Sequence, residues 1–317
     1  MAQHFLLSAT ARSLSLAKVM RMTEDQAFDA FRSIRWADTD GDAVCGKCGG
    51  CECYTFKARR IFKCKACGSQ FSVTSGTIFA SRKMDLRDIL AAIAIFVNGA
   101  KGHSALQLSR DLDVQYKTAF VLSHKIREAL AKEQATSKID GEASVDGAYF
   151  GGYVKPANKR ADRKDRRRKV YQTGKRQAVV VIRDHDGDTL TTVAKHESEG
   201  VAYVMANVQP GTVVHADEAN HWDALEAKYL TKRINHTEAY SLDGACTNHA
   251  ESFFSRIRRA EVGIHHHIAG PYLAAYASEM AWREDNNRIS NGEQFLLATS
   301  SALAHPVSRV WKGYWQR

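Results

Sequence analysis

Two Cys-x-x-Cys pairs constrain the fold of this chain more than any other feature of its sequence. Fifteen residues separate the two pairs, which are Cys45 with Cys48 and Cys64 with Cys67. Four thiolates at this spacing can hold one zinc ion in a tetrahedral site. The segment between the pairs contains the aromatic and strand-forming residues that are typical of zinc-ribbon hairpins. The sequence therefore predicts a zinc ribbon over residues 41–80 with a structural zinc ion.

The identity of the four zinc ligands is open to one alternative. Cys51 and Cys53 lie inside the same segment, and either can replace one of the four. Because four thiolates complete the coordination sphere, we expect the zinc to stabilise the fold and to bind no substrate. Six of the seven cysteines lie between positions 45 and 67, which favours metal binding over disulfides in a cytosolic protein.

The positive charge of the chain is concentrated in one segment. The formal net charge is +10, and the segment 155–176 alone carries eleven basic and two acidic residues. Such a patch predicts a polyanionic partner, and we expect double-stranded DNA. The expected phosphate contacts are Lys155, Lys159, Arg160, Arg163, Lys164, Arg166, Arg167, Arg168 and Lys169.

The sequence predicts no membrane partner. A transmembrane helix needs about 20 consecutive apolar residues. The longest apolar run, from Ile89 to Val97, has nine residues. The first residues lack the long apolar region and the cleavage site of a secretory signal. We therefore expect a cytoplasmic protein.

Helical patterns flank the predicted ribbon. Residues 1–40 are expected to form an N-terminal helical segment, in which Thr23 and Gln26 have the spacing of a capping box. Residues 84–135 show the apolar period of three helices with short breaks. A short helix, a turn and a longer helix are typical of a helix-turn-helix, although a plain helical bundle gives the same pattern. In a helix-turn-helix, Lys117 would begin the recognition helix and contact DNA.

From residue 140 to residue 295 strands alternate with helices. The expected order is β-β-β-α-β-α-β-α, with a helix over 221–229, a final helix over 271–288 and a C-terminal tail over 296–317. This order predicts an α/β fold, with an RNase H-like catalytic domain preceded by the zinc ribbon and the helix-turn-helix segment.

Three carboxylates occupy related places in this domain. Asp146 lies on the first strand, Asp217 ends a later strand, and Glu251 lies on the following helix. Taken singly, each acid is more often a turn or surface residue. Brought together they would repel one another, so the group predicts Mg²⁺ or Mn²⁺ as catalytic cofactor. Two such ions about 4 Å apart support phosphoryl transfer by activating the attacking oxygen and stabilising the leaving oxygen.

The helix that carries Glu251 holds further candidates. Asn248 and Arg258 fall on the same face as Glu251 at helical spacing. Arg258 is expected to bind phosphate. Asn248 is an alternative third metal ligand, but a carboxylate binds a hard cation better than an amide does, so we favour Glu251. His249 and residues 265–267 can also ligate metal, although beside a basic helix they fit phosphate contacts better.

These features resemble a known family. The motifs that carry the resemblance are the ribbon followed by residues 71–79, the strand 145–152, the segment 215–217 and the segment 247–255. They are similar to those of bacterial insertion-sequence DDE transposases of the zinc-ribbon group, whose catalytic domain is called ISXO2-like. The separation of 34 positions between Asp217 and Glu251 is close to the usual one in DDE transposases. In this group a Glu often follows the first Asp, where this chain has Gly147, and some members have Asn as third ligand.

The resemblance implies a DNA transposase. Such an enzyme binds the terminal inverted repeats of an insertion sequence and catalyses metal-dependent strand cleavage and strand transfer. It would act at the nucleoid of a bacterium, as a homodimer or larger assembly on DNA, because two element ends must be brought together. The alternative is a transposase-derived regulator that binds DNA without cutting it.

Overall fold

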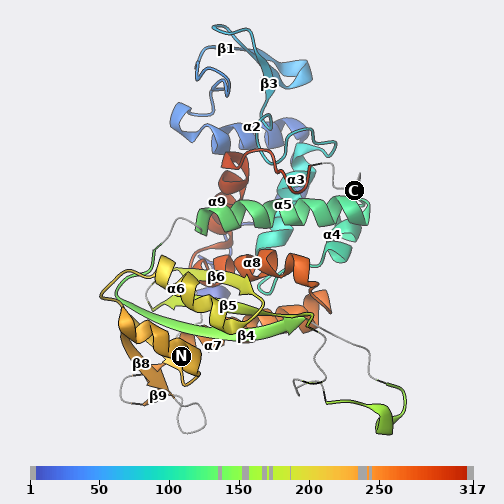
Figure 1. Ribbon diagram of the computed structural model, residues 1–317. Helices are drawn as coiled ribbons and strands as arrows, with labels where there is room; N and C mark the ends of the chain where they lie inside the picture. The colour runs from blue at the N-terminus through green and yellow to red at the C-terminus, as the bar shows by residue number, and fades with distance from the viewer. Residues whose placement is uncertain are drawn as a thin grey trace. The chain divides into compact units, whose positions relative to one another are not determined.

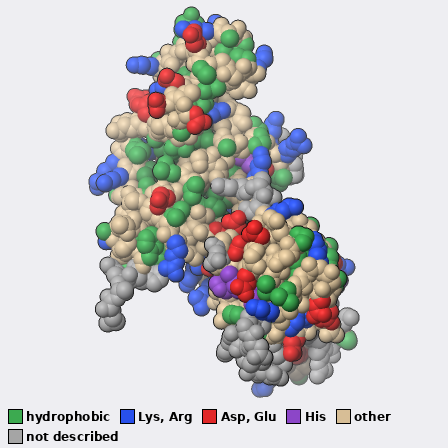
Figure 2. Space-filling view, turned by 90° about the vertical axis from the view of Figure 1, so that its left-hand side faces the viewer, with side chains coloured by type: hydrophobic (Ala, Val, Ile, Leu, Met, Phe, Trp, Pro, Cys, Tyr) green, Lys and Arg blue, Asp and Glu red, His purple; other side chains and the backbone are tan. Residues whose placement is uncertain are grey.

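The computed structural model of the chain describes residues 5–134, 138–151, 157–165, 170, 174–185, 187–234, 241–242 and 245–312. The chain divides into two compact units, residues 1–133 with 286–317 and residues 134–285 (Figure 1). Acidic and basic side chains are spread over the surface in the view of Figure 2. Every helix within the described ranges is too short or too polar to cross a bilayer.

The first unit begins with short helices and a small antiparallel sheet. Its elements are η1 (Phe5–Leu7), α1 (Leu16–Met20), α2 (Glu24–Arg35), η2 (Ala37–Thr39), β1 (Cys53–Phe56), η3 (Lys57–Arg59), β2 (Ile61–Cys64) and β3 (Gln70–Ser72). The strand order is β1-β2-β3. The predicted capping box on α2 is confirmed, since Thr23 and Gln26 bond each other's backbone N–H groups. The rings of Phe28 and Phe62 stack at 5.7 Å, so an aromatic core joins α2 to the sheet.

Three helices follow at the predicted positions. They are α3 (Leu86–Asn98), α4 (Ala105–Asp111) and α5 (Tyr116–Gln134). Ser104 caps α4 as expected, because its side chain accepts a hydrogen bond of 3.1 Å from the backbone N–H of Gln107. Lys117 is exposed in the first turn of α5. The use of these helices as a DNA-binding motif stays a prediction.

The C-terminal residues of the first unit differ from the expected tail. The helix α9 (Asn291–Ala304) runs through the boundary that we expected at residue 295. A capping box of Ser290 and Glu293 begins this helix, and Ala298 and Ala302 bury one face of it. Further on, the Trp311 ring is buried and stacks on the His124 ring at 4.5 Å. Most of the described part of 296–317 is therefore packed structure.

The second unit is built on a mixed five-stranded sheet. Its strands are β4 (Glu142–Gly151), β5 (Arg176–Asp184), β6 (Thr189–Ala194), β7 (Val213–Asp217) and β8 (Leu230–Ile234), in the spatial order β6-β5-β4-β7-β8. The first three strands pair antiparallel, and β7 and β8 run parallel to β4. This order confirms the predicted α/β class and is that of an RNase H-like domain.

Helices cover both faces of this sheet. The remaining elements are η4 (Arg160–Asp162), η6 (Glu197–Glu199), α6 (Gly200–Asn207), η7 (Asn220–Ala227), β9 (Ser241–Leu242), β10 (Ala245–Cys246), α7 (Asn248–Ala260), η8 (Glu261–His265), η9 (Gly270–Tyr272) and α8 (Leu273–Asp285). The α-helix predicted over 221–229 is instead the 3₁₀ helix η7. The final helix predicted over 271–288 is the shorter α8.

Successive side chains of β4 and β5 point to opposite faces of the sheet. Ala148 and Val181 belong to a core that α7 and α8 complete. Val145 and Val180 belong to a second core with α6 and η7. Because β4 and β5 are buried on both faces, the middle of β5, from Ala178 to Ile182, is apolar without interruption. Asp146 pairs with Val181, so its side chain faces α7.

Candidate metal centres and active site

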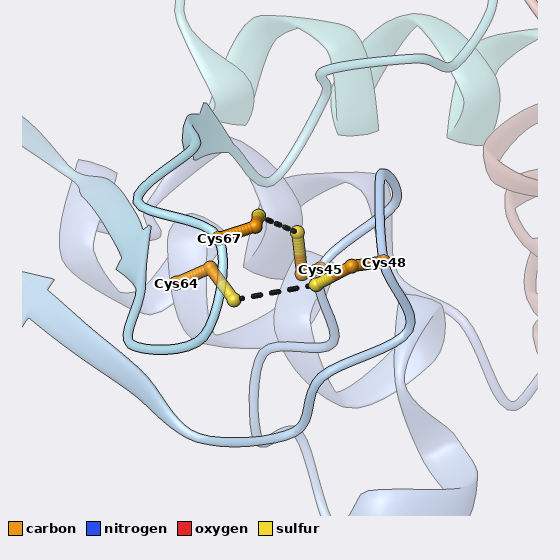
Figure 3. Close-up of side chains that lie close together, drawn as sticks. All are labelled: Cys45, Cys48, Cys64 and Cys67. Carbon is orange, nitrogen blue, oxygen red and sulfur yellow. Dashed lines mark hydrogen bonds between the residues drawn. The ribbon is translucent and has the colours of Figure 1, made fainter.

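The cysteine cluster consists of the four predicted thiols. One ligand atom from each residue lies within 4.8 Å of the others, and the residues are Cys45, Cys48, Cys64 and Cys67. Figure 3 shows the four sulfurs turned toward one another from two facing turns. The sulfurs of Cys45 and Cys67 lie 3.6 Å apart, and those of Cys48 and Cys64 lie 3.5 Å apart. This set of soft donors suits a structural zinc ion.

Two equivalent turns present these thiols. Each has the sequence Cys-x-x-Cys-Gly, and the glycines have φ values of 73° at Gly49 and 69° at Gly68. In each turn the glycine N–H bonds the carbonyl of the first cysteine, at 2.8 Å and 3.1 Å. The amides of Cys48 and Lys47 lower the pKa of the Cys45 thiol to about 7. Backbone N–H groups thus favour the thiolate of Cys45 before any metal is bound.

The alternative ligands lie outside this cluster. The thiol of Cys51 is exposed and points to the carbonyl of Gly49, and that of Cys53 lies 4.0 Å from the carbonyl of Gly50. Burial raises the pKa of Cys53, which opposes thiolate formation. The geometry therefore favours the four cysteines of the two equivalent turns.

Strand register brings Asp146 and Asp217 together. The parallel strands β4 and β7 place Ser144 beside His215. Two residues further along, on the same face, come Asp146 on β4 and Asp217 at the end of β7. Their carboxylate oxygens belong to one group within 4.8 Å, which also contains Glu197. We call Asp146, Glu197 and Asp217 the carboxylate cluster.

Glu197 is a member of this cluster that the sequence analysis missed. It lies in η6, immediately before α6, and its side chain is half-buried. Burial, and then the charges of Asp146 and Asp217, raise the pKa of Glu197 to about 7. Three acids at this distance suit a cation with oxygen ligands such as Mg²⁺ or Mn²⁺.

Glu251 reaches the same region from α7 without joining the carboxylate cluster. It lines a pocket of about 570 Å³ with Asp146, Phe254, Ser255, Arg258 and Arg259. Glu251 and Arg258 thus line one pocket with Asp146, and their roles stay predictions. Asn248 is the exposed first residue of α7, one turn before Glu251.

An ion-pair network fixes α7 against the sheet. Glu284 of α8 is 6% exposed and forms an ion pair of 2.7 Å with Arg183 of β5. The same carboxylate contacts Arg256 of α7. Arg183 also donates a hydrogen bond of 3.1 Å to the hydroxyl of Ser252, the residue after Glu251. These contacts hold the first two turns of α7, and with them Glu251, in one position.

Comparison with known families decides what this geometry belongs to. Residues 138–285 match the model of the ISXO2-like transposase domain, and residues 22–70 match that of the transposase zinc-ribbon domain. Together the two matches span more than half of the chain and include both the carboxylate cluster and the cysteine cluster. The chain belongs to the ISXO2-like transposases. Residues 138–285 are its DDE transposase catalytic domain.

The transposase also resembles individual proteins. It is 23% identical over 274 residues to an uncharacterized protein in transposable element ISH50 of Halobacterium salinarum, covering 80% of this chain and 90% of the relative. Among solved structures it is similar to a Mos1 transposase paired-end complex with left transposon end, at 10% identity over 68% of this chain and 79% of that chain. The Mos1 strand transfer complex gives 13% identity over 67% and 78%. The TM-score of 0.26 in both cases is too low to support an argument.

A second group of ligand-type residues in the transposase is a hydrogen-bond network. It consists of Glu142, His185 and His215. The Nε2 atom of His215 lies 2.6 Å from Oε1 of Glu142, and Nδ1 accepts a hydrogen bond of 3.0 Å from the N–H of Cys246. The bond from His215 lowers the pKa of Glu142. Because both nitrogens of His215 are engaged, this group ties β4, β7 and β10 together.

The structure describes some of the basic residues that were predicted to contact DNA. Lys159, Arg160, Arg163 and Lys164 are exposed between β4 and β5. The remaining ones, Lys155, Arg166, Arg167, Arg168 and Lys169, lie outside the described residues. In the view of Figure 2, the described Lys and Arg side chains form no single large patch.

Proposed function

We propose that this transposase binds the terminal inverted repeats of an insertion sequence, cleaves DNA at the element ends and joins the freed 3′-hydroxyls to target DNA. The convergence of Asp146 and Asp217 within the matched catalytic domain carries the proposal. Carboxylates on adjacent parallel strands, with a basic helix beside them, suit phosphoryl transfer on a polyanion.

The donor set fits the metal that the family implies. Asp146, Asp217 and Glu251 would hold Mg²⁺ or Mn²⁺, with Asn248 as an alternative to Glu251. Burial, and then the charges of Asp146 and Asp217, raise the pKa of Glu197 to about 7, so a cation bound here would favour the charged form of an acid that adjoins both aspartates. Bound cations would activate the attacking oxygen and stabilise the leaving oxygen of the phosphodiester.

Basic residues of α7 would position the DNA. Arg258 and Arg259 line the pocket that contains Asp146 and Glu251. The guanidinium of Arg258 lies 5.9 Å from the centre of the Phe254 ring, which restricts its orientation. A phosphate held by these two cations lies beside the acids, where a water or a 3′-hydroxyl can attack in line. Neither DNA cleavage nor strand transfer needs a covalent bond between protein and DNA.

The first unit would supply sequence recognition. The zinc ribbon and the helices α4 and α5, with Lys117 exposed, are the proposed contacts to the inverted repeats. The basic residues between β4 and β5 would add phosphate contacts that are independent of sequence. Two ends must be processed together, so we propose that a homodimer or larger assembly acts on DNA.

A strand-transfer assay tests this function. Labelled DNA from the flanks of the gene is incubated with Mg²⁺ and either wild-type protein or Asp217→Ala. We expect the wild type to nick at the end and join it to a second duplex, and the variant to bind without doing either. A wild type that binds tightly and never cuts with Mg²⁺ or Mn²⁺ would instead indicate the DNA-binding regulator.

A further inference from the structure

Gly147 leaves a space on β4 that the carboxyl group of Glu197 fills. A Cβ atom at position 147 would lie 2.3 Å from Cγ and 2.4 Å from both Cδ and Oε1 of Glu197. The backbone of Gly147 is outside the left-handed region, so its conformation does not require glycine. The glycine therefore provides room, and the atoms that use this room belong to one acidic side chain.

A second glycine brings the same turn against the sheet. A Cβ atom at Gly200 would lie 2.6 Å from Cγ2 of Val180, the residue that pairs with Gly147 across β4 and β5. The backbone N–H of Glu197 also donates a hydrogen bond of 3.3 Å to the hydroxyl of Tyr149. The turn that carries Glu197 is thus held close to the sheet at Gly147 by three separate contacts.

The topology explains why Glu197 can approach the two aspartates. The pairing of β4 with β7 ends at Ser144, although β4 continues to Gly151. Beside Gly147 the edge of β4 is therefore free of a β7 partner. Gly147 pairs with Val180 and so faces the core of α6, whereas Asp146 faces α7. Glu197 reaches the cluster from the side of the sheet opposite to Glu251.

A basic side chain does not account for this position of Glu197. Among the described residues, the only base within ion-pair distance of Glu197 is His221, whose Nε2 lies 3.6 Å from Oε1. That Nε2 atom is buried without a hydrogen-bond partner in the described part of the chain. A cation shared with the aspartates is the partner that the carboxyl group fits.

We propose that Glu197 is a further ligand of the catalytic cations and that Gly147 is the residue that admits it. The inference rests on the proposed function, since it assigns one more residue to the same metal site. Asp146, Glu197 and Asp217 then form the inner set of oxygen donors, and Glu251 approaches from α7.

Binding of Mn²⁺ alone, measured by isothermal titration calorimetry on the full chain without DNA, tests the proposal. We expect Glu197→Gln to weaken Mn²⁺ binding by roughly 10- to 100-fold. Glu199→Gln is the matched control, because Glu199 lies in the same 3₁₀ helix, is exposed and is outside the carboxylate cluster. Its affinity for Mn²⁺ should equal that of the wild type. Equal affinity of Glu197→Gln and the wild type would overturn the inference.

Asp146→Asn separates this failure from failure of the proposed function. If Asp146→Asn loses Mn²⁺ binding and Glu197→Gln retains it, the metal site stands and only the role of Glu197 is wrong. If Asp146→Asn also binds Mn²⁺ like the wild type, the metal site of the proposed function is wrong as well.

A separate variant, Gly147→Ala, tests the role of Gly147. Gly147→Ala would displace only the end of a flexible side chain, so we expect a folded protein with unchanged circular dichroism. Its Mn²⁺ affinity should fall as much as that of Glu197→Ala, and the double variant should show no further loss, because both changes remove the same ligand. Wild-type affinity in Gly147→Ala, or additive losses in the double variant, would refute the role of Gly147.

Discussion

In the cysteine cluster four equal ligands come from two copies of one five-residue turn, whereas the carboxylate cluster draws its acids from three separate elements. The turns hold each thiol by local hydrogen bonds, such as the 2.8 Å bond from Gly49 to the carbonyl of Cys45. The acids are held by long-range structure, since strand register sets Asp146 beside Asp217 and the glycine at position 147 admits Glu197.

The difference matches the two kinds of chemistry. Four soft thiolates close a tetrahedral shell, so a metal there can stabilise structure but has no position left for substrate. Hard carboxylates bind Mg²⁺ or Mn²⁺, which keep positions for water and phosphate. The pocket lined by Asp146, Glu251 and Arg258 gives the acids an opening toward a substrate. A closed site needs only local turns, while an open one depends on the whole sheet.

The largest expected effect is on folding, which should depend on the cysteine cluster and not on the carboxylate cluster. Cys45→Ser should abolish zinc binding, which in small zinc domains is worth on the order of 10 kcal/mol, and should unfold the ribbon. Metal analysis of the purified protein and limited proteolysis of residues 45–72 measure the two losses. Cys51→Ser should keep one zinc ion per chain and the protease resistance. Loss of zinc in Cys51→Ser would show that our choice of four ligands is wrong.

The next effect sharpens the description of the carboxylate site. Glu251 lines the pocket with Asp146, whereas Asn248 is exposed at the start of α7. We expect Glu251→Gln to lower the rate of DNA cleavage by roughly 100-fold and Asn248→Ala by less than about tenfold. Single-turnover cleavage of a labelled element end gives both rates. The reverse order would identify Asn248 as the third ligand.

A smaller effect concerns the grip on DNA beside the acids. Because Arg258 is expected to contact one phosphate, Arg258→Ala should reduce the slope of log K against log salt by about 1. Affinity should fall similarly for specific and unrelated duplexes. Fluorescence anisotropy at several salt concentrations measures the slope, and Arg258→Lys should retain it. An unchanged slope in Arg258→Ala would remove this residue from the DNA contacts.

The smallest effect contrasts two half-buried acids, Asp285 and Glu197. Burial raises the pKa of Asp285 to about 6 from 3.8, so the folded protein binds more protons than the unfolded chain between these values. The free energy of unfolding therefore falls as pH rises from about 4 to about 6. Asp285→Asn keeps an oxygen for the hydrogen bond from Gln134 and removes this penalty. We expect its melting temperature to rise by roughly 2–4 °C at pH 7.5 and less at pH 5.

Metal distinguishes Asp285 from Glu197. Asp285 is outside the carboxylate cluster, so Mn²⁺ should leave the effect of Asp285→Asn unchanged. At Glu197, Mn²⁺ should stabilise the wild type more than Glu197→Gln. Melting curves with and without Mn²⁺ make this comparison. Equal stabilisation of the wild type and Glu197→Gln by Mn²⁺ would argue that Glu197, like Asp285, does not bind the metal.

The sequence predicted those parts of the site that depend on local pattern. The cysteine spacing indicated the cluster because both turns are short and equivalent. Asp146 and Asp217 could be paired because each lies on a strand-like run, and the order of elements makes those strands parallel neighbours. The helix α9 had a signal, since Ser290 and Glu293 have the spacing of a capping box, but residues 296–317, which include most of this helix, were taken as a tail.

Glu197 could not be recognised in this way. Its neighbours read as the start of a helix, where acids are common because they interact well with the helix dipole. Its role depends on the close approach of η6 to β4, which no local period encodes. The one available signal was Gly147, a glycine inside a strand, which often marks a close approach. The 3₁₀ helix η7 was also predicted as an α-helix, because both place apolar side chains such as Trp222 and Leu225 on one face.

The most direct measurement of the central claim is an anomalous difference map from crystals of the transposase grown with Mn²⁺. We predict a peak among the carboxylates of Asp146, Asp217 and Glu197, and its absence from crystals of Asp146→Asn. A map without a peak there, or with its Mn²⁺ peak at Glu142, His185 and His215 instead, would contradict the assignment of the carboxylate cluster as the catalytic metal site.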